Sequence, residues 1–321
     1  MEKDINISGV SENLAESIAE QNEVQADKTP VSFLNGRRIA ISVSVCEEIE
    51  FLGLSTQHLD DISIEIARYL IVNGATMLYG GDLRHGGFTR LFSELSYQYK
   101  YLSDKERRFV NYFPFPNSKA VTLDDKANFI KQQVEPIILE VPKHLGEIDT
   151  EKEYKPFVNV HDRFVYSECF ADMRVRMAND CNARIVLGGK QKGYLGYLPG
   201  IIEEAYHTLA AKKPIYILGG FGGAARSLAH VILGKQLKEL TNEFHYDSEF
   251  LKEFRRYCQD KAITPIDFDV VSKFFQENTI EHLSEQNGLS VEENKILFES
   301  TNIHELVFLI IKGLKRTFSK G

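Results

Sequence analysis

The sequence predicts an α/β fold, a Rossmann-like parallel sheet flanked by helices, with a helical appendage at the C-terminus. Two observations lead to this prediction. Between about residues 38 and 240, short β-branched runs alternate with longer segments of helical periodicity, which is typical of parallel strands joined by crossover helices. Three of the short runs end in a diglycine, and the strand signal is lost after residue 245.

The first half of the alternation contains three expected strands. The first is rich in β-branched residues, which suits a buried strand, and the helix after it stops at a glycine. The expected elements, in order, are strand RIAISVSV, helix DDISIEIARYLIVNG, strand ATMLYGG, helix FTRLFSELSYQYKYL, possible strand FVNYFPF, the segment KANFIKQQVEPIILEVP and the exposed excursion KHLGEIDTEKEYKP.

The second half repeats the pattern. Its elements are helix DRFVYSECFADMRVRMANDC, strand ARIVLGG, loop KQKGYLGYLPG, helix IIEEAYHTLAAKK, strand PIYILGG and helix GGAARSLAHVILGKQL. In open parallel sheets a ligand lies beyond the carboxyl ends of the strands, where the strand order changes direction. The diglycine turns at Gly80–Gly81, Gly188–Gly189 and Gly219–Gly220 are therefore expected on one edge of the sheet.

The pattern also divides the chain into three parts. Residues 1–30 carry seven acids and two bases and are expected to form a flexible acidic tail. Residues 31–245 contain the alternation and form the expected nucleotide-binding domain. Residues 246–321 are expected to form the helical appendage, as a packing or oligomerisation surface.

Composition narrows the function classes. The net charge is −8, of which the tail carries −5, and the mildly acidic body that remains argues against a dedicated nucleic-acid binder. No apolar run approaches the roughly 20 residues of a membrane span. The four cysteines are scattered and the histidines lack metal spacing, so we expect a cytoplasmic protein without a metal or cofactor. A Walker spacing, G-x-G-x-x-G and G-x-S-x-G are all missing.

The first glycine turn, YGGDLRHGGF, combines an unconstrained backbone with an arginine. Glycine allows the chain to approach a phosphate closely, the following helix adds its positive end, and arginine can donate two hydrogen bonds to phosphate oxygens. An ordinary glycine-rich turn with its arginine in water is the alternative. The expected ligand-binding residues are Gly80, Gly81, Asp82, Arg84, Gly86 and Gly87.

The second turn, in RIVLGGKQKGYLGYLPGIIEEA, is followed by two acids at the start of a helix. Helix-dipole capping would explain Glu203 and Glu204, but beside an anion site a carboxylate is better explained by ribose hydroxyls or a developing positive charge. Consecutive helical residues point about 100° apart, so only one faces the ligand, and we favour Glu204. The other expected ligand-binding residues of this segment are Gly188, Gly189, Lys190, Pro199 and Gly200.

The third turn, GGFGGAARS, repeats the strand–glycine–helix design. Tight packing of the following alanines on the sheet explains it as well as ligand contact does. Its expected ligand-binding residues are Gly219, Gly220, Phe221 and Gly222. On the helix before the second turn, Arg174 and Arg176 flank the apolar stripe on opposite sides. We expect Arg174 on the ligand side.

These motifs resemble a known superfamily. MANDCNARIVLGG…LPGIIEEA resembles the Lonely-Guy phosphoribohydrolases, whose strand ends in a Pro-Gly-Gly-x-Gly-Thr-x-x-Glu turn. With YGGDLRHGGF and PIYILGGFGGAA, the sequence is more similar still to the SLOG domains of bacterial conflict systems, over roughly residues 36–240. The resemblance implies a Rossmann-like domain that senses or processes nucleotides, including NAD-derived signals in antiphage defence.

The resemblance transfers unevenly to this chain. The phosphoribohydrolase glutamate corresponds to Glu203 or Glu204, and its helix arginine lies near Arg174, one residue out of register. The turn is stretched to GGKQKGYLGYLPG and lacks the threonine. This insertion weighs against hydrolysis, because an attacking water must be held within about 3 Å of the reacting carbon.

Two functions from different classes follow. The first is a nucleotide sensor in which the glycine turns, Arg84, Lys190 and Arg174 hold phosphates and Glu204 holds a ribose. The second is an N-glycosidase acting on a nucleoside 5′-monophosphate or NAD-like nucleotide, with Glu203, Glu204 and Arg174 as catalytic residues. A scaffold with a decayed site is a third interpretation. The expected partners are a small nucleotide, further copies of the chain and a separate effector protein, without nucleic acid or membrane.

Overall fold

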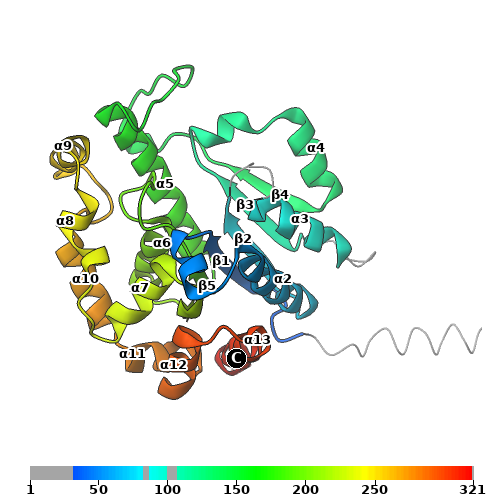
Figure 1. The fold of residues 1–321 in the computed structure, drawn as a ribbon. Coiled ribbons are helices and arrows are strands. Elements are labelled where there is room, and N and C mark those ends of the chain that lie inside the picture. Colours follow the sequence, from blue (N-terminus) through cyan, green and yellow to red (C-terminus); the bar gives the residue numbers. More distant parts are fainter. Residues whose placement is uncertain (1–31, 82–86, 100–106, 320–321) are drawn as a thin grey trace, which may run out of the picture.

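The computed structural model describes residues 32–81, 87–99 and 107–319 (Figure 1). In these residues, parallel strands form a single sheet in the order β4-β3-β2-β1-β5-β6, flanked by helices. The predicted α/β Rossmann-like class is confirmed. The strands are β1 (Arg38–Ser44), β2 (Thr76–Gly80), β3 (Phe109–Phe113), β4 (Val134–Ile138), β5 (Ala183–Gly188) and β6 (Ile215–Leu218).

The direction of the strand order changes between β1 and β5. From β1 the chain moves outward through β2 and β3 to β4, and then returns to place β5 on the other side of β1. Ser44 lies opposite Gly188 in the register, so the two strands end at the same level. Both are covered on their two faces, which explains why their sequences are nearly continuous apolar runs.

Helices cover both faces of the sheet. Helix α5 (Val160–Asp180) places Met173 and Met177 against Ala40 and Leu78 on one face, where α6 (Gly200–Ala210) also lies. Because side chains alternate along a strand, the neighbours of these residues point to the opposite face. The opposite face and the edge of the sheet are covered by α2 (Thr56–Val72), α3 (Phe88–Gln98), α4 (Leu123–Lys131) and α7 (Gly223–Ile232).

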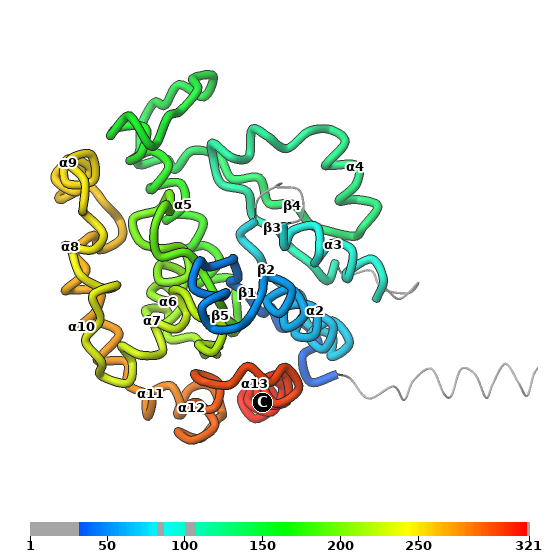
Figure 2. Tube along the Cα trace, in the orientation of Figure 1, coloured from blue at the N-terminus to red at the C-terminus, as the bar shows by residue number. Residues whose placement is uncertain are grey.

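The predicted helical appendage shares its core with the sheet. The hydroxyl of Tyr216 in β6 donates to the carbonyl of Asn287 at 2.8 Å, and the Asn287 side chain donates to the carbonyl of Ile215 at 3.1 Å. Figures 1 and 2 show the last helix beside α2. Helix α8 (Asn242–His245) precedes the appendage, which comprises α9 (Glu249–Cys258), α10 (Phe268–Glu277), α11 (Ile280–Asn287), α12 (Val291–Glu299) and α13 (Ile303–Phe318). One continuous hydrophobic core therefore runs across residue 245.

None of the helices in the described ranges has the length and apolar character that a membrane span needs.

Two histidines attach the appendage to the rest of the molecule. His207 of α6 places Nε2 3.1 Å from the Thr264 hydroxyl, and His245 stacks on Phe268 with ring centroids 3.8 Å apart. Burial lowers the pKa of each from 6.5 to about 4, aided at His207 by the charge of Arg174. Each imidazole is therefore neutral in the folded state while the unfolded chain takes up a proton below pH 6.5.

We expect the contribution of these two histidines to the free energy of unfolding to be fully present above about pH 6.5 and to fall as the pH drops towards 4. Since one pKa unit corresponds to about 1.4 kcal/mol, each histidine contributes up to about 3 kcal/mol to this loss. Urea unfolding between pH 4 and 7 measures it. His207→Gln and His245→Gln are expected to flatten the profile, whereas His282→Gln, at an exposed position, is expected to leave it unchanged. Equal slopes in all four proteins would contradict the assignment.

Candidate functional site

The three diglycine turns lie at the carboxyl ends of their strands. β2 ends at Gly80, β5 ends at Gly188, and Gly219 directly follows β6. Because all the strands are parallel, these ends belong to one edge of the sheet. Gly87 precedes α3. Asp82, Arg84 and Gly86 lie outside the described residues.

The turns after β2 and β6 are packed against protein. A Cβ at Gly80 would lie 2.9 Å from Met173 Cε of α5. At Gly219 a Cβ would overlap the carbonyl oxygen of Phe298, in the last turn of α12, and at Gly220 it would overlap that of Ser300, which directly follows α12. These glycines therefore allow close packing of backbone, including that of the appendage. Gly81, likewise, leaves no room for a Cβ beside Thr89, and Phe221 is buried.

The turn after β5 borders a pocket of about 580 Å³. The pocket lies where the strand order changes direction, beyond the ends of β1 and β5. Its walls are the 3-10 helix η1 (Glu47–Leu52), which follows β1, the loop that begins at Gly189 and Lys190, and the first turns of α7. Of the expected ligand-binding residues that the structure describes, Gly189 and Lys190 line this pocket.

A carboxylate occupies the positive end of α7 inside the pocket. Oε2 of Glu48 accepts a hydrogen bond from the backbone N–H of Gly223 at 2.9 Å. Oε1 lies 3.1 Å from Nη1 of Arg226. Gly223 has φ of +66°, and a Cβ there would overlap the Gly189 carbonyl, so only glycine brings this N–H to the pocket. The site thus binds an anionic oxygen pair through one backbone amide and one guanidinium.

The remaining polar groups of the pocket differ in how far they are engaged. Lys190 is exposed and forms no hydrogen bond or ion pair with the described part of the chain. Lys192 is paired with Asp247 at 2.7 Å. Gln191 donates to the Ser227 hydroxyl at 2.9 Å. Among the described residues, the pocket therefore offers Lys190 as an unpaired cation, and neutral donors of the kind that bind hydroxyl groups.

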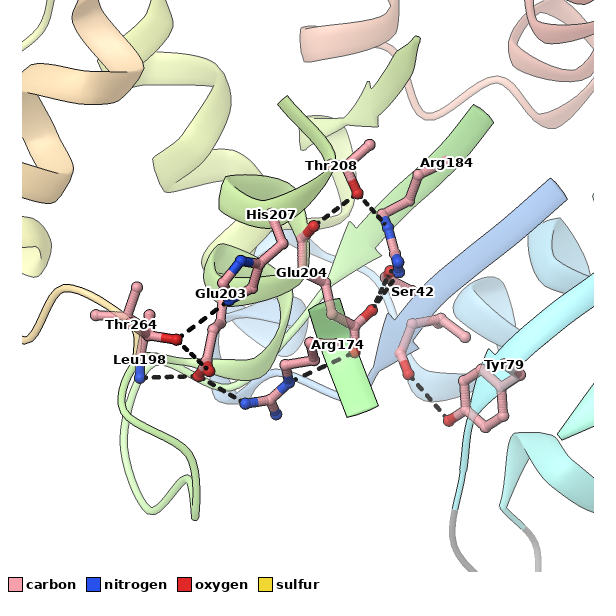
Figure 3. A network of polar contacts seen from close by, with 11 residues as sticks. Ser42, Tyr79, Arg174, Arg184, Leu198, Glu203, Glu204, His207, Thr208 and Thr264 are labelled. Atoms are coloured by element: carbon pink, nitrogen blue, oxygen red, sulfur yellow. Dashed lines mark hydrogen bonds and ion pairs between the residues drawn. The ribbon is translucent and has the colours of Figure 1, made fainter. Parts of the chain in front are cut away.

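The expected catalytic residues come together in a different place. On the α5 and α6 face of the sheet, Arg174 lies between Glu203 and Glu204 (Figure 3). Its Nη1 lies 2.6 Å from Glu203 Oε2, and its Nε lies 3.9 Å from Glu204 Oε1. The residues of this cluster are absent from the described lining of the pocket.

Glu203 is fully buried and both its oxygens are bonded. Besides Arg174, the backbone N–H of Leu198 donates to Oε2 at 3.1 Å, and the Thr264 hydroxyl donates to Oε1 at 3.3 Å. Burial raises the pKa of Glu203, and the charge of Arg174 opposes that rise. Pro199 precedes α6, and Gly200 leaves the Arg174 guanidinium room, since a Cβ there would lie 3.1 Å from Nη2.

Glu204 is held by a second arginine. Nη1 of Arg184, on β5, donates to its Oε2 at 2.7 Å, and the Ser42 hydroxyl also donates to Oε2. Arg184 is completely buried and donates from Nε to Thr208 Oγ1 at 2.6 Å. An arginine within the otherwise apolar strand ARIVLGG is the sequence signal that could have revealed a buried partner for a carboxylate. Both glutamates therefore form buried ion pairs.

Sequence reasoning missed Glu48, Phe51 and Arg226 of the pocket. Arg226 stands in GGFGGAARS, one turn into the helix after the third glycine turn, which was a usable signal. Glu48 and Phe51 belong to a 3-10 helix whose short sequence has no periodicity to reveal it.

The chain matches the model of a known family. The family model described as SLOG cluster2 matches residues 33–297. The matched range includes the whole sheet and continues through most of the helices after residue 245. A comparison with curated proteins finds no match.

Proposed function

Because this chain belongs to the SLOG cluster2 family, we propose that it is a nucleotide sensor of a bacterial conflict system. It binds a phosphorylated ribose nucleotide, NAD-derived or cyclic, in the pocket between η1, the loop after β5 and α7. Ligand binding then changes its assembly with further copies or with a separate effector protein in the cytoplasm.

The site that holds the Glu48 carboxylate is the observation that carries this proposal. It consists of the Gly223 N–H and the Arg226 guanidinium, and we call it the seat. A phosphate needs the same partners as that carboxylate, namely a backbone N–H at a helix start and a guanidinium. Lys190 supplies a further cation that no acid of the described chain neutralises. The volume falls within the roughly 300–1,000 Å³ of small-molecule sites, and the position is the usual one for ligands of open parallel sheets.

The buried ion pairs favour sensing over hydrolysis. A carboxylate that positions a water needs a free oxygen, and both oxygens of Glu203 are already bonded. One observation keeps an N-glycosidase as the second candidate. Oε1 of Glu204 accepts no hydrogen bond within the described residues, where its nearest ion-pair partner is Arg174 Nε at 3.9 Å.

Titration calorimetry against ADP-ribose, NAD, cyclic ADP-ribose isomers and nucleoside monophosphates tests the proposal. We expect one of them to bind, and at a hundred times its Kd to raise the free energy of unfolding by about 2.7 kcal/mol. Lys190→Ala is expected to weaken binding about tenfold, since a charged hydrogen bond contributes about 1.5–3 kcal/mol.

The control is Lys273→Ala, which removes an exposed lysine of α10 that does not line the pocket. Its affinities should match those of the unchanged protein. Failure of every nucleotide to bind would contradict the proposal. Chromatography of the same samples separates the two functions, because a sensor returns the nucleotide intact, whereas a glycosidase releases free base and loses that activity in Glu204→Gln.

A further inference from the structure

Helix η1 presents two unusual side chains to the pocket. Glu48 occupies the positive end of α7, and Phe51 has 90% of its surface exposed. Residues three positions apart on a 3-10 helix lie on the same side, and both residues line the pocket. An acid and an aromatic ring of one 3-10 helix therefore both line the pocket that contains the anion-binding site.

The Glu48 carboxylate can leave its seat without unfolding η1. Its side chain is 38% exposed, so it reaches solvent by rotating. The adjacent Ile49 is buried and holds the backbone of η1 in place. When Glu48 turns away, the Gly223 N–H and the Arg226 guanidinium lose the acceptor that they share. An incoming phosphate restores both bonds.

The charges around the pocket favour this exchange. The acids that line it are Glu47, Glu48 and Glu239, and its bases are Lys190, Lys192 and Arg226 beside His230. Lys192 is already paired with Asp247 outside the lining. Removing Glu48 from the seat leaves Arg226 and Lys190 without an ion-pair partner among the described residues. The phosphate of ribose 5-phosphate carries a charge of about −1.5 to −2, and the diphosphate of ADP-ribose carries one negative charge on each phosphate, so either group matches those two cations.

Phe51 offers a surface for the part of the ligand that lies away from its phosphate. An exposed aromatic ring beside a phosphate seat is a surface on which a planar base stacks, and such stacking contributes about 1–3 kcal/mol per base. Gln191 and Ser227, in the same lining, carry the hydrogen-bonding groups that a ribose between base and phosphate requires. The pocket then matches a complete nucleotide.

We propose that Glu48 is an intramolecular substitute for the ligand's phosphate, displaced when a nucleotide binds, and that the base of that nucleotide stacks on Phe51. This inference rests on the proposed function and assigns two residues of its site. It also makes the sensor selective, because a ligand must carry enough negative charge to displace a carboxylate already in place.

Calorimetric titration of the full chain with ADP-ribose and ribose 5-phosphate tests the Glu48 assignment. Glu48→Gln keeps the shape of the side chain and removes the competing charge. Since charge-assisted bonds are about twice as strong as neutral ones, we expect it to tighten binding of both probes about tenfold. Glu50→Gln removes an equal charge from an exposed position of the same 3-10 helix, outside the pocket lining, and its affinities should change less than twofold.

The same titrations test Phe51. Phe51→Ala is expected to weaken binding of ADP-ribose at least fivefold and to leave ribose 5-phosphate, which has no base, unchanged. Phe308→Ala removes another exposed ring, on α13 outside this pocket, and should alter neither affinity.

The outcomes separate this inference from the proposed function. If the unchanged protein binds ADP-ribose and Glu48→Gln binds it no more tightly than Glu50→Gln, the inference is overturned and the nucleotide sensor stands. If Glu48→Gln binds a probe and the unchanged protein does not, the Glu48 carboxylate blocks the phosphate position in the unchanged protein, and the inference holds. If no variant binds either probe, this inference fails, and the sensor then depends on the other nucleotides of the wider titration.

Discussion

Arg174→Met is expected to lower the free energy of unfolding by about 3–5 kcal/mol. The substitution keeps much of the side-chain volume but removes the charge that lies 2.6 Å from Glu203. Glu203 is fully buried, and after the change the hydrogen bonds left to it within the described residues come from the Leu198 N–H and the Thr264 hydroxyl. An unpaired buried carboxylate is among the most costly groups in a folded protein. Urea unfolding at pH 7 measures the loss.

Two variants make this experiment decisive. Arg176→Met changes the next arginine of α5, which is 55% exposed and pairs with Asp172 at i and i+4, so its cost is expected to stay below about 0.5 kcal/mol. The double change Arg174→Met with Glu203→Leu should recover most of the stability, because an apolar pair replaces a buried ion pair at little cost. Equal stability of Arg174→Met and the unchanged protein would show that the pair does not hold the fold together.

Gly220→Ala is expected to destabilise the protein by about 2–3 kcal/mol, the upper part of the range for overpacking. A Cβ at this position would overlap the carbonyl of Ser300 and come within 2.9 Å of that of Glu299. Both are backbone atoms of the junction between α12 and α13, so no side-chain rotation relieves the overlap. The junction must shift, and hydrogen exchange at its amides should become faster.

Gly193→Ala provides the comparison. Gly193 has φ of +66°, but nothing lies within 4 Å of the position of its Cβ. Only the backbone conformation opposes alanine there, at a cost of about 1 kcal/mol. If Gly220→Ala proves as stable as the unchanged protein but loses nucleotide binding, then this glycine exists for a ligand and not for the packing of the appendage.

The strands other than β4, and most helices of the sheet, could be predicted because their signals are local; β4 lies in the segment KANFIKQQVEPIILEVP, to which no strand was assigned. Runs such as RIAISVSV carry β-branched residues throughout, and each central strand is bounded by a glycine turn or a helical pattern. The helical character of residues 246–321 was equally local. Its attachment was not, because periodicity shows which residues are buried and not what buries them. The bond from Tyr216 to Asn287 spans 71 residues.

The site was harder to predict for the same reason. Glu203 and Glu204 are adjacent in the sequence, but Arg174 and Arg184, which pair with them, come from a different helix and from a strand. A glycine that admits a neighbouring backbone, such as Gly220, looks the same in a sequence as one that admits a phosphate. Lys190 was placed beside the pocket from its strand–glycine context.

A crystal structure with bound ADP-ribose tests the central claim most directly. We predict a phosphate at the start of α7, accepting hydrogen bonds from the Gly223 N–H and Arg226, with the Glu48 side chain turned away from its present position. A nucleotide bound instead between Arg174 and the end of β2, with Glu48 still bonded to Gly223, would contradict the account.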